Sequence, residues 1–304
     1  MSPRKAITSC HGMSVFALIA AALALAPALS RGQVPGMTLD QQNDHYGYYT
    51  YNTHSGWQSF TAGTNGHLGA VQLWLYSTGG SSGYSGGGNW SATLRIYEGE
   101  GSSGRILAEQ PISGDGALQR RSFVLDTPVR QTAGQKYTIY FGGSAVHLTV
   151  RMSVDLYSGG YSANSGYDYN FMTYVITSDW SEEAYRDTTF TTNMTVISTA
   201  AQLAQFAHLV NSGTKMSASA VELAADLNLT GHFWTPIATN GHPGGSYRFL
   251  GNGHTVRSVV IDRPNADCQG LFGYWSARIY GLTVADADIG GAIASEASRA
   301  KPPR

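Results

Sequence analysis

The sequence has 304 residues, which is long enough for two modest domains. Glycine is more frequent than its usual share of ~7%, with 37 of the 304 residues. There is no Gly-X-Y period, however, which excludes a collagen-like fibre. Hydrophobic residues make up 42% of the chain, which excludes wholesale disorder. The net charge is −1 without any basic run, so the sequence lacks the clustered lysine and arginine of a nucleic-acid-binding protein.

Residues 1–28 are predicted to be a signal peptide. Arg4 and Lys5 form a positive start, and an apolar run from Val15 to Leu25 follows. Ala26-Pro27-Ala28 then supplies the small residues of a cleavage site. The apolar run is shorter than the ~20 residues that a membrane span needs. We therefore expect a secreted or cell-surface protein, with no transmembrane segment in the mature chain.

The number of cysteines indicates which secretory route the protein uses. Cys10 lies in the predicted signal peptide, so the mature chain keeps only Cys268 and forms no internal disulfide. Small secreted domains of eukaryotes usually depend on disulfides. Their absence favours a bacterial secretory route and a core large enough to be stable without them.

A tyrosine-rich segment, residues 29–55, precedes a predicted antiparallel β-sandwich of jelly-roll topology over residues 56–177. Short β-rich runs alternate there with Gly, Ser and Asn turns, and several runs show period two without any helical period. The predicted strands are Trp57–Thr61, Leu68–Tyr76, Thr93–Glu98, Ile106–Gln110, Arg121–Leu125, Lys136–Phe141, Val146–Met152 and Asn170–Val175.

Parts of this segment carry a resemblance. The residues concerned are Gln58-Ser59-Phe60-Thr61-Ala62, Leu94-Arg95-Ile96-Tyr97-Glu98-Gly99, Leu107-Ala108 and Thr132-Ala133-Gly134-Gln135-Lys136-Tyr137-Thr138-Ile139. Their order resembles the jelly-roll accessory modules of secreted bacterial proteins, some of which are related in shape to carbohydrate-binding modules. The resemblance implies a fold, because these positions define strands rather than ligand contacts.

Polar residues 178–192 are predicted to be a linker, and a helix is expected soon after it. Thr199 as N-cap and Gln202 three residues later form a capping box. Asn211-Ser212-Gly213 supplies the stop signal. The apolar face of this helix is formed by Leu203, Phe206, Ala207 and Val210.

Residues 193–290 are predicted to form a short parallel β-helix with this helix as a cap, and residues 291–304 a disordered tail. Val256, Val259 and Ile261 match Ile279, Leu282 and Val284 at a constant offset, which would stack one coil on the next. The last coil would then be open and would expose a strand edge, through which the protein could self-associate. A truncated reading frame is the alternative explanation for so few coils.

This second part also carries a resemblance. The residues concerned are Ile197–Leu203, Val221–Leu229, Trp234–Ile237, Phe249–Val256 and Gly270-Leu271-Phe272-Gly273. As an ordered set they are similar to the opening of the right-handed β-helices of bacterial surface proteins with GLUG repeats, a family that includes adhesin-like proteins. The resemblance implies a right-handed β-helix at a cell surface.

Aromatic residues in loops are the candidates for ligand binding, because flat amphipathic rings can stack on sugars while their polar tips stay wet. The alternative is that these rings cover the ends of the sandwich. Trp74 alternates with core positions and is expected to face outward. The main candidates are Trp57, Tyr84, Trp90, Tyr157, Tyr161 and Tyr167.

Acidic residues provide a weaker hypothesis. Asp286 and Asp288 are predicted to alternate on one strand, where they could serve as acid and base of a glycoside hydrolase or polysaccharide lyase. We assign no catalytic residue and no metal site. No cofactor is expected, with calcium at the loop carboxylates of Glu98, Glu100 or Asp115 as the alternative.

Three functions stay open at this point. The first is a non-catalytic secreted or surface protein that binds polysaccharide or a cell-surface glycan. The second is a polysaccharide-active enzyme or a fragment of one. The third is a structural module that associates with itself through the open coil.

Overall fold

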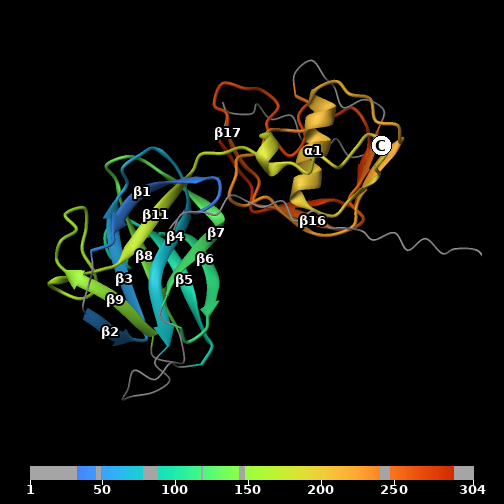
Figure 1. Cartoon of the computed structure of the whole chain (residues 1–304). Coiled ribbons are helices and arrows are strands. Elements are labelled where there is room, and N and C mark those ends of the chain that lie inside the picture. The colour runs from blue at the N-terminus through green and yellow to red at the C-terminus, as the bar shows by residue number, and fades with distance from the viewer. Residues whose placement is uncertain are drawn as a thin grey trace, which may run out of the picture. The chain divides into compact units, whose positions relative to one another are not determined.

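The computed structural model describes residues 33–45, 49–77, 88–117, 119–143, 148–239 and 247–290 (Figure 1). The predicted signal peptide and the tail after residue 290 lie outside them. Within the described residues the regular structure is almost entirely β-strand, with one α-helix and one short 3-10 helix. The expected all-β class is confirmed.

Eleven strands form two antiparallel sheets that share one core. The larger sheet contains β1 (Met37–Asn43), β2 (Tyr49–Thr53), β4 (Gly66–Ser77), β7 (Arg120–Gln131), β9 (Leu148–Val154), β10 (Tyr167–Tyr169) and β11 (Phe171–Ile176). The smaller sheet has the order β3 (Ser55–Thr61), β8 (Lys136–Gly142), β5 (Trp90–Glu98) and β6 (Ile106–Gly114).

Period-two alternation explains how the two sheets pack. On β4, Leu73 and Leu75 are buried in the core while Trp74 between them is partly exposed on the outer face. On β8, Ile139 and Phe141 enter the same core from the other sheet. Each sheet therefore keeps an outer face that is free of the shared core.

All eight strands predicted for the sandwich are present, but the sandwich starts earlier than predicted. β1 pairs with β11 and β2 pairs with β9, so both belong to the larger sheet although they precede residue 56. Their sequences alternate weakly, because β1 carries several polar residues and pairs at the sheet's edge.

Residues 178–192, predicted to be a linker, pack against the second part of the chain. Phe190 is fully buried in the second hydrophobic cluster. The indole Nε1 of Trp180 donates to the carbonyl of Leu229 at 2.9 Å. A 3-10 helix, η1 (Glu183–Tyr185), turns the chain between them.

The predicted helix is present as α1 (Ala200–Asn211). Thr199 is the N-cap, and its hydroxyl accepts from the backbone N–H of Gln202 at 3.2 Å. The Gln202 side chain accepts from the N–H of Ser198 at 2.8 Å, which satisfies a second backbone donor at the N-terminus of α1. The predicted apolar face, Leu203, Phe206, Ala207 and Val210, is buried.

The cap of α1 supports a first prediction. Replacing Thr199 with alanine leaves the Gln202 N–H without its partner, and we expect the free energy of unfolding to fall by about 1 kcal/mol. Thr199→Ser keeps the acceptor and is expected to restore most of the loss. Urea unfolding followed by circular dichroism measures both, and equal losses in the two variants would contradict the capping role.

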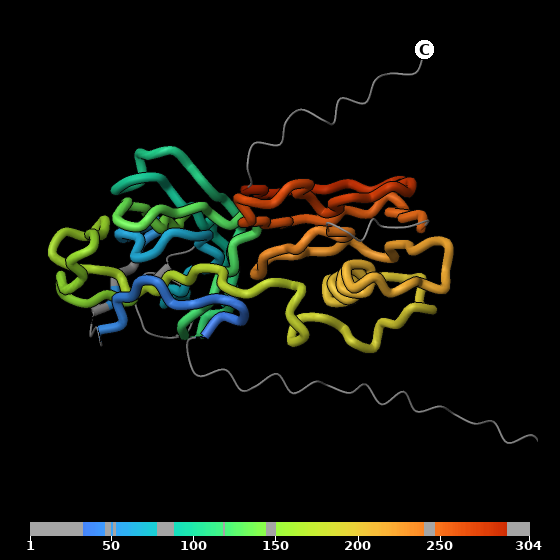
Figure 2. Tube along the Cα trace, turned by 90° about the horizontal axis from the view of Figure 1, so that it is seen from above, coloured from blue at the N-terminus to red at the C-terminus, as the bar shows by residue number. Residues whose placement is uncertain are grey.

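β12, just before α1, and the strands after α1 pair in parallel in three small sheets (Figure 2). The chain visits one sheet after another, and Figure 2 shows successive passages lying one above the next. The first sheet contains β12 (Val196–Ile197), β13 (Ala220–Leu223), β15 (Arg248–Leu250) and β18 (Ile279–Tyr280). The second contains β14 (Leu227–Asn228), β16 (Thr255–Arg257) and β19 (Thr283–Ala285), and the third contains β17 (Val260–Asp262) and β20 (Asp288–Gly290).

The register predicted for these strands is wrong. Val256 pairs with Val284 rather than with Ile279, and Ile261 pairs with Ile289 rather than with Val284. The predicted offset matched strands that belong to different sheets, because the long connection between β17 and β18 makes this passage longer than the apolar pattern suggested.

A glycine turn lets two passages approach closely. A Cβ on Gly251 would lie 2.5 Å from the carbonyl oxygen of Gly281 and 2.6 Å from Cα of Leu282. Asn252 and Gly253 follow with φ of 52° and 84°, values that asparagine and glycine adopt at least cost. Gly251, Asn252 and Gly253 thus form a sharp turn between the two passages.

Candidate functional site

The outer face of the smaller sheet presents a continuous set of aromatic side chains. The residues of β3, β8 and β5 that alternate with core positions point outward, because Phe60, Ile139 and Ile96 fill the shared core. Trp57 on β3 lies directly opposite Tyr140 on β8. Side chains opposite each other in an antiparallel pair are close enough to touch.

Two further rings extend this pair to both sides. The ring centroids of Trp57 and Tyr161 are 5.5 Å apart, in an edge-on arrangement. Those of Tyr140 and Tyr97 are 5.9 Å apart, also edge-on. Tyr161, Trp57, Tyr140 and Tyr97 are named the aromatic row below. Its exposure falls along the row, from 51% at Tyr161 to 7% at Tyr97.

Tyr161 is held beside Trp57 by backbone hydrogen bonds to the edge of β3. The N–H of Ser59 donates to the carbonyl of Tyr161 at 2.9 Å, and the N–H of Ala163 donates to the carbonyl of Trp57 at 2.9 Å. A Cβ on Gly160 would lie 2.3 Å from the Ser59 carbonyl oxygen, so glycine is required for this approach. The connection before β10 thus continues the smaller sheet by one short pairing.

Charged groups flank the aromatic row. Arg95 lies opposite Tyr140 on β5, with its guanidinium carbon 5.5 Å from the ring centroid, and it pairs with Glu109 on β6. Lys136 pairs with Glu100 at the other side. The Glu100 carboxylate next to Tyr161 raises the pKa of the tyrosine hydroxyl. The face therefore combines flat apolar rings with hydrogen-bonding groups at both sides.

The structure brings together only two of the predicted ligand-binding residues, Trp57 and Tyr161. Tyr157 packs edge-on against Phe171 at 5.0 Å, and burial raises the pKa of its hydroxyl to about 12. Tyr167 also packs against the core. Tyr84 lies outside the described residues.

Trp90 is not available for stacking, contrary to the prediction. It is 3% exposed and lies in the core, where its Nε1 donates to the carbonyl of Asp115 at 2.9 Å. The physical reason is that β5 begins at Trp90, so the alternation that places Leu94 and Ile96 inside places Trp90 inside as well.

Tyr140 and Tyr97 were not among the ligand-binding residues predicted from the sequence. A signal for both was present, because Tyr137 and Ile139 define the inner face of β8 and leave Tyr140 on the outer face. The same alternation on β5 puts Tyr97 outside. The position of Tyr140 opposite Trp57 depends on the pairing of β3 with β8, which alternation does not predict.

The acid and base hypothesis for Asp286 and Asp288 is corrected by their placement. β19 ends at Ala285 and β20 begins at Asp288, so the two residues do not alternate on one strand. Asp286 has φ of 51° in the turn between them. The carboxylate of Asp288 is 2.9 Å from Nε2 of His67, and this hydrogen bond lowers the pKa of Asp288.

The loop carboxylates considered for calcium are used in ion pairs. Glu98 pairs with Arg105 at 3.1 Å, and Asp115 pairs with Arg121. The hydrogen bond from the N–H of Ala117, followed by that from Arg121, lowers the pKa of Asp115. Glu100 is the partner of Lys136. Among the described residues there is no group of three His, Cys, Asp or Glu side chains that could hold a metal ion.

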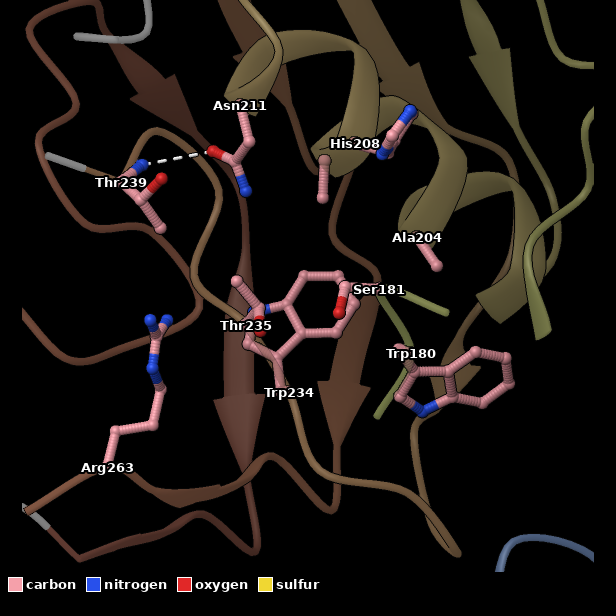
Figure 3. A pocket seen from close by; sticks show the side chains of 10 residues that line it. Trp180, Ser181, Ala204, His208, Asn211, Trp234, Thr235, Thr239 and Arg263 are labelled. Carbon is pink, nitrogen blue, oxygen red and sulfur yellow. Dashed lines mark hydrogen bonds between the residues drawn. The ribbon is translucent and has the colours of Figure 1, made fainter. Parts of the chain in front are cut away.

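A hollow of about 160 Å³ lies beneath α1 (Figure 3). Asn211 donates to the carbonyl of Pro236 at 2.9 Å and accepts from the N–H of Thr239 at 3.0 Å. The hydroxyl of Thr235 donates to Asp179 at 3.0 Å. These hydrogen bonds join residues around the hollow to one another, so the side chains that make them stabilise the local structure. The wall also includes Trp180, Ala204, His208, Trp234 and Arg263.

In the part of the chain that the structure describes, no helix is long and apolar enough to cross a membrane.

No family model matches the chain, and no curated protein matches it. Two solved structures are similar to parts of it. The carbohydrate-binding module TmCBM61 in complex with β-1,4-galactotriose has 12% identity, covers 43% of this chain and 73% of its own, and gives a TM-score of 0.22. The catalytic domain of a GH87 α-1,3-glucanase in complex with tetrasaccharides has 12% identity, covers 78% of this chain and 44% of its own, and gives a TM-score of 0.26. Scores this low assign neither a family nor a function to this chain.

Proposed function

We propose that the chain is a non-catalytic binding protein that contacts carbohydrate through the aromatic row. The observation that carries the proposal is the alignment of four rings across β3, β8 and β5, with Arg95, Glu109, Lys136 and Glu100 beside them. Sugar rings present apolar C–H faces that pack on aromatic rings, while their hydroxyls need donors and acceptors around the contact.

The shape of this face favours an extended glycan over a single sugar. Strands in a sheet lie about 4.8 Å apart, so rings on neighbouring strands repeat at a spacing comparable to one sugar unit of an extended chain. Trp57 and Tyr140 are both partly exposed on adjacent strands and can be contacted together. A polysaccharide lying across the strands would therefore meet several rings at once.

The location and the finer fold are part of the same proposal. The signal peptide predicted at residues 1–28 supports secretion, or attachment to a bacterial surface. We further propose a jelly-roll sandwich up to about residue 177 and a short right-handed β-helix with GLUG-like motifs up to residue 290. The parallel pairing of successive passages, one strand per sheet, supports the β-helix.

Glycan arrays and polysaccharide pull-down with the mature chain test this function. The wild-type protein is expected to retain at least one class of polysaccharide, and Trp57→Ala and Tyr140→Ala are each expected to weaken that binding about tenfold. Tenfold corresponds to about 1.4 kcal/mol, a reasonable value for one ring-stacking contact. Isothermal titration with a soluble oligosaccharide from the retained class would give the dissociation constants.

Tyr280→Ala is the matched control, because Tyr280 is also an exposed tyrosine, at 45%, but lies on β18 away from the aromatic row. Its binding is expected to equal that of the wild type. Failure of the mature chain to bind any glycan or cell-wall fraction, or unchanged affinity in Trp57→Ala, would contradict the proposal. Release of reducing ends from a polysaccharide would contradict its non-catalytic part.

A further inference from the structure

The outermost described passage of the parallel stack exposes apolar side chains that have buried counterparts one passage earlier. Ile279 on β18, Val284 on β19 and Ile289 on β20 are 40%, 45% and 45% exposed. Each pairs in register with a residue of the preceding passage that is 0% exposed in the second hydrophobic cluster. Those partners are Phe249, Val256 and Ile261. Residues in register on adjacent strands point to the same face of a sheet, so the three exposed residues continue the apolar interior of the stack.

The same passage leaves three strand edges without a partner, and it is named the open passage below. β18, β19 and β20 are each a terminal strand of their sheet, and among the described residues no strand pairs with their outer side. The unpaired N–H and C=O groups of such an edge can bind a strand of another molecule. The three edges belong to three sheets, so only a partner that presents strands in the same arrangement can pair with all of them.

The open passage also lacks the residues that usually protect exposed strand edges. Charged side chains and prolines provide this protection in most sheets. β18, β19 and β20 contain no proline, and Asp288 is their one charged residue. Its carboxylate is bound 2.9 Å from Nε2 of His67. A two-fold contact brings identical charges together, so an edge with almost no charge suits a second copy of the same chain.

A helix covers the opposite end of the stack. β12 is the other terminal strand of the sheet that includes β18, and α1 follows β12 directly in the chain. Figure 2 shows α1 on the far side of the stack from the open passage. The apolar face of α1 is buried in the second hydrophobic cluster. This end therefore presents a helix instead of three strand edges, and it does not match the open passage of a second copy.

We propose that two copies of this chain associate through their open passages and form a closed two-fold dimer. A two-fold axis reverses the strand direction, so the edge of β18 pairs antiparallel with an edge of the second copy. Ile279, Val284 and Ile289 become buried, as their counterparts one passage earlier already are. Because α1 covers the other end of each copy, the association stops at two.

The dimer goes beyond the proposed function and does not depend on carbohydrate binding. The aromatic row lies on the smaller sheet and its adjoining connection, and none of its residues belongs to the open passage. Either property can therefore fail without the other. Dimerisation is expected to be unchanged in Trp57→Ala, whatever the effect of this substitution on glycan binding. Loss of the dimer in Trp57→Ala would overturn the assignment of the contact to the open passage.

Sedimentation velocity of the mature chain between about 1 and 100 µM tests the inference. The wild type is expected to shift from monomer toward dimer as the concentration rises. Val284→Arg is expected to weaken the dimer at least tenfold, because it places an arginine of each copy in a contact that excludes water. Val284 is 45% exposed in the single copy, so the melting temperature should fall by no more than a few degrees. Hydrogen exchange is expected to slow in residues 279–290 at the higher concentration.

Exposed side chains elsewhere supply the controls. Leu39→Arg places the same charge on β1, a terminal strand of the larger sheet where Leu39 is 42% exposed, and should leave the dimer intact. Tyr280→Ala should also leave it intact, because Tyr280 alternates with Ile279 and points to the outer face of β18. A chain that stays monomeric at about 100 µM, or that forms species larger than a dimer, would overturn the inference. So would a dimer that persists unchanged in both Val284→Arg and Ile289→Arg.

Discussion

Replacing Trp234 with alanine is expected to lower the free energy of unfolding by about 3–5 kcal/mol, the usual loss for a fully buried aromatic residue. Trp234 is 1% exposed and belongs to the second hydrophobic cluster together with the apolar face of α1. Its Nε1 donates to the carbonyl of Leu271 at 3.1 Å, and its backbone N–H donates to the carbonyl of Val260 at 2.7 Å. Alanine would leave a cavity and would remove one of the two donors to the Leu271 carbonyl, which keeps the N–H of Ile237 at 3.0 Å.

Urea unfolding followed by far-ultraviolet circular dichroism measures this loss. Trp234→Phe retains most of the ring and loses the hydrogen bond, so it is expected to cost about 1–2 kcal/mol. Tyr280→Ala removes an exposed ring and should change the stability by no more than about 0.5 kcal/mol. A loss below 1 kcal/mol in Trp234→Ala would show that this core is not packed as described.

Replacing Asp168 with alanine is expected to cost about 3 kcal/mol, because its buried carboxylate accepts three hydrogen bonds. Oδ1 accepts from the Gln58 side chain at 3.1 Å. Oδ2 accepts from the N–H groups of Leu156 at 2.9 Å and Tyr157 at 2.8 Å. These bonds anchor the start of the connection that carries Tyr161, so the substitution should also weaken glycan binding at the aromatic row.

The same residue makes the stability depend on pH in a defined direction. Burial raises the pKa of the Asp168 carboxyl above its unfolded value of about 3.9, so the folded state binds this proton more tightly than the unfolded state does. The stability contributed by this titration is fully present below the unfolded pKa and is lost as the pH rises through the folded pKa. We therefore expect the difference between wild type and Asp168→Ala to be larger at pH 4 than at pH 7.

Thermal unfolding at both pH values measures this difference, at about 2–4 °C per kcal/mol for a domain of this size. Asp267→Ala is the control, since Asp267 is an exposed carboxylate and is not among the groups that shift the pKa of Asp168. Its effect should stay within about 0.5 kcal/mol at either pH. A larger loss for Asp168→Ala at pH 7 than at pH 4 would contradict the assigned direction of the pKa shift.

Local patterns predicted the elements of this fold better than their pairing. Alternation in Leu73-Trp74-Leu75 correctly placed Trp74 outside, and the capping box correctly placed the start of α1 at Thr199. Both features depend only on residues a few positions apart. The pairing predicted for the strands after α1 was wrong, because apolar residues on different sheets look alike in sequence. Only the lengths of the connections distinguish them.

The proposed aromatic row shows the same limit. Trp57 and Tyr161 were predicted from loop aromatics, but the row that they complete needs Tyr140, which the pairing of β3 with β8 brings opposite Trp57. Sites assembled by strand order become visible only once that order is known.

The short pairing of residues 161–163 with β3 also protects the molecule. β3 is the terminal strand of the smaller sheet, and the hydrogen bonds from and to Ser59, Tyr161 and Ala163 occupy part of its free side. An unoccupied border of this kind can recruit a strand from another molecule and start aggregation. At the opposite edge of the smaller sheet, Pro111 of β6 lacks the N–H that would bind an incoming strand. The segment that positions Tyr161 thus also covers part of the edge of β3, and we expect it to disfavour association through that edge.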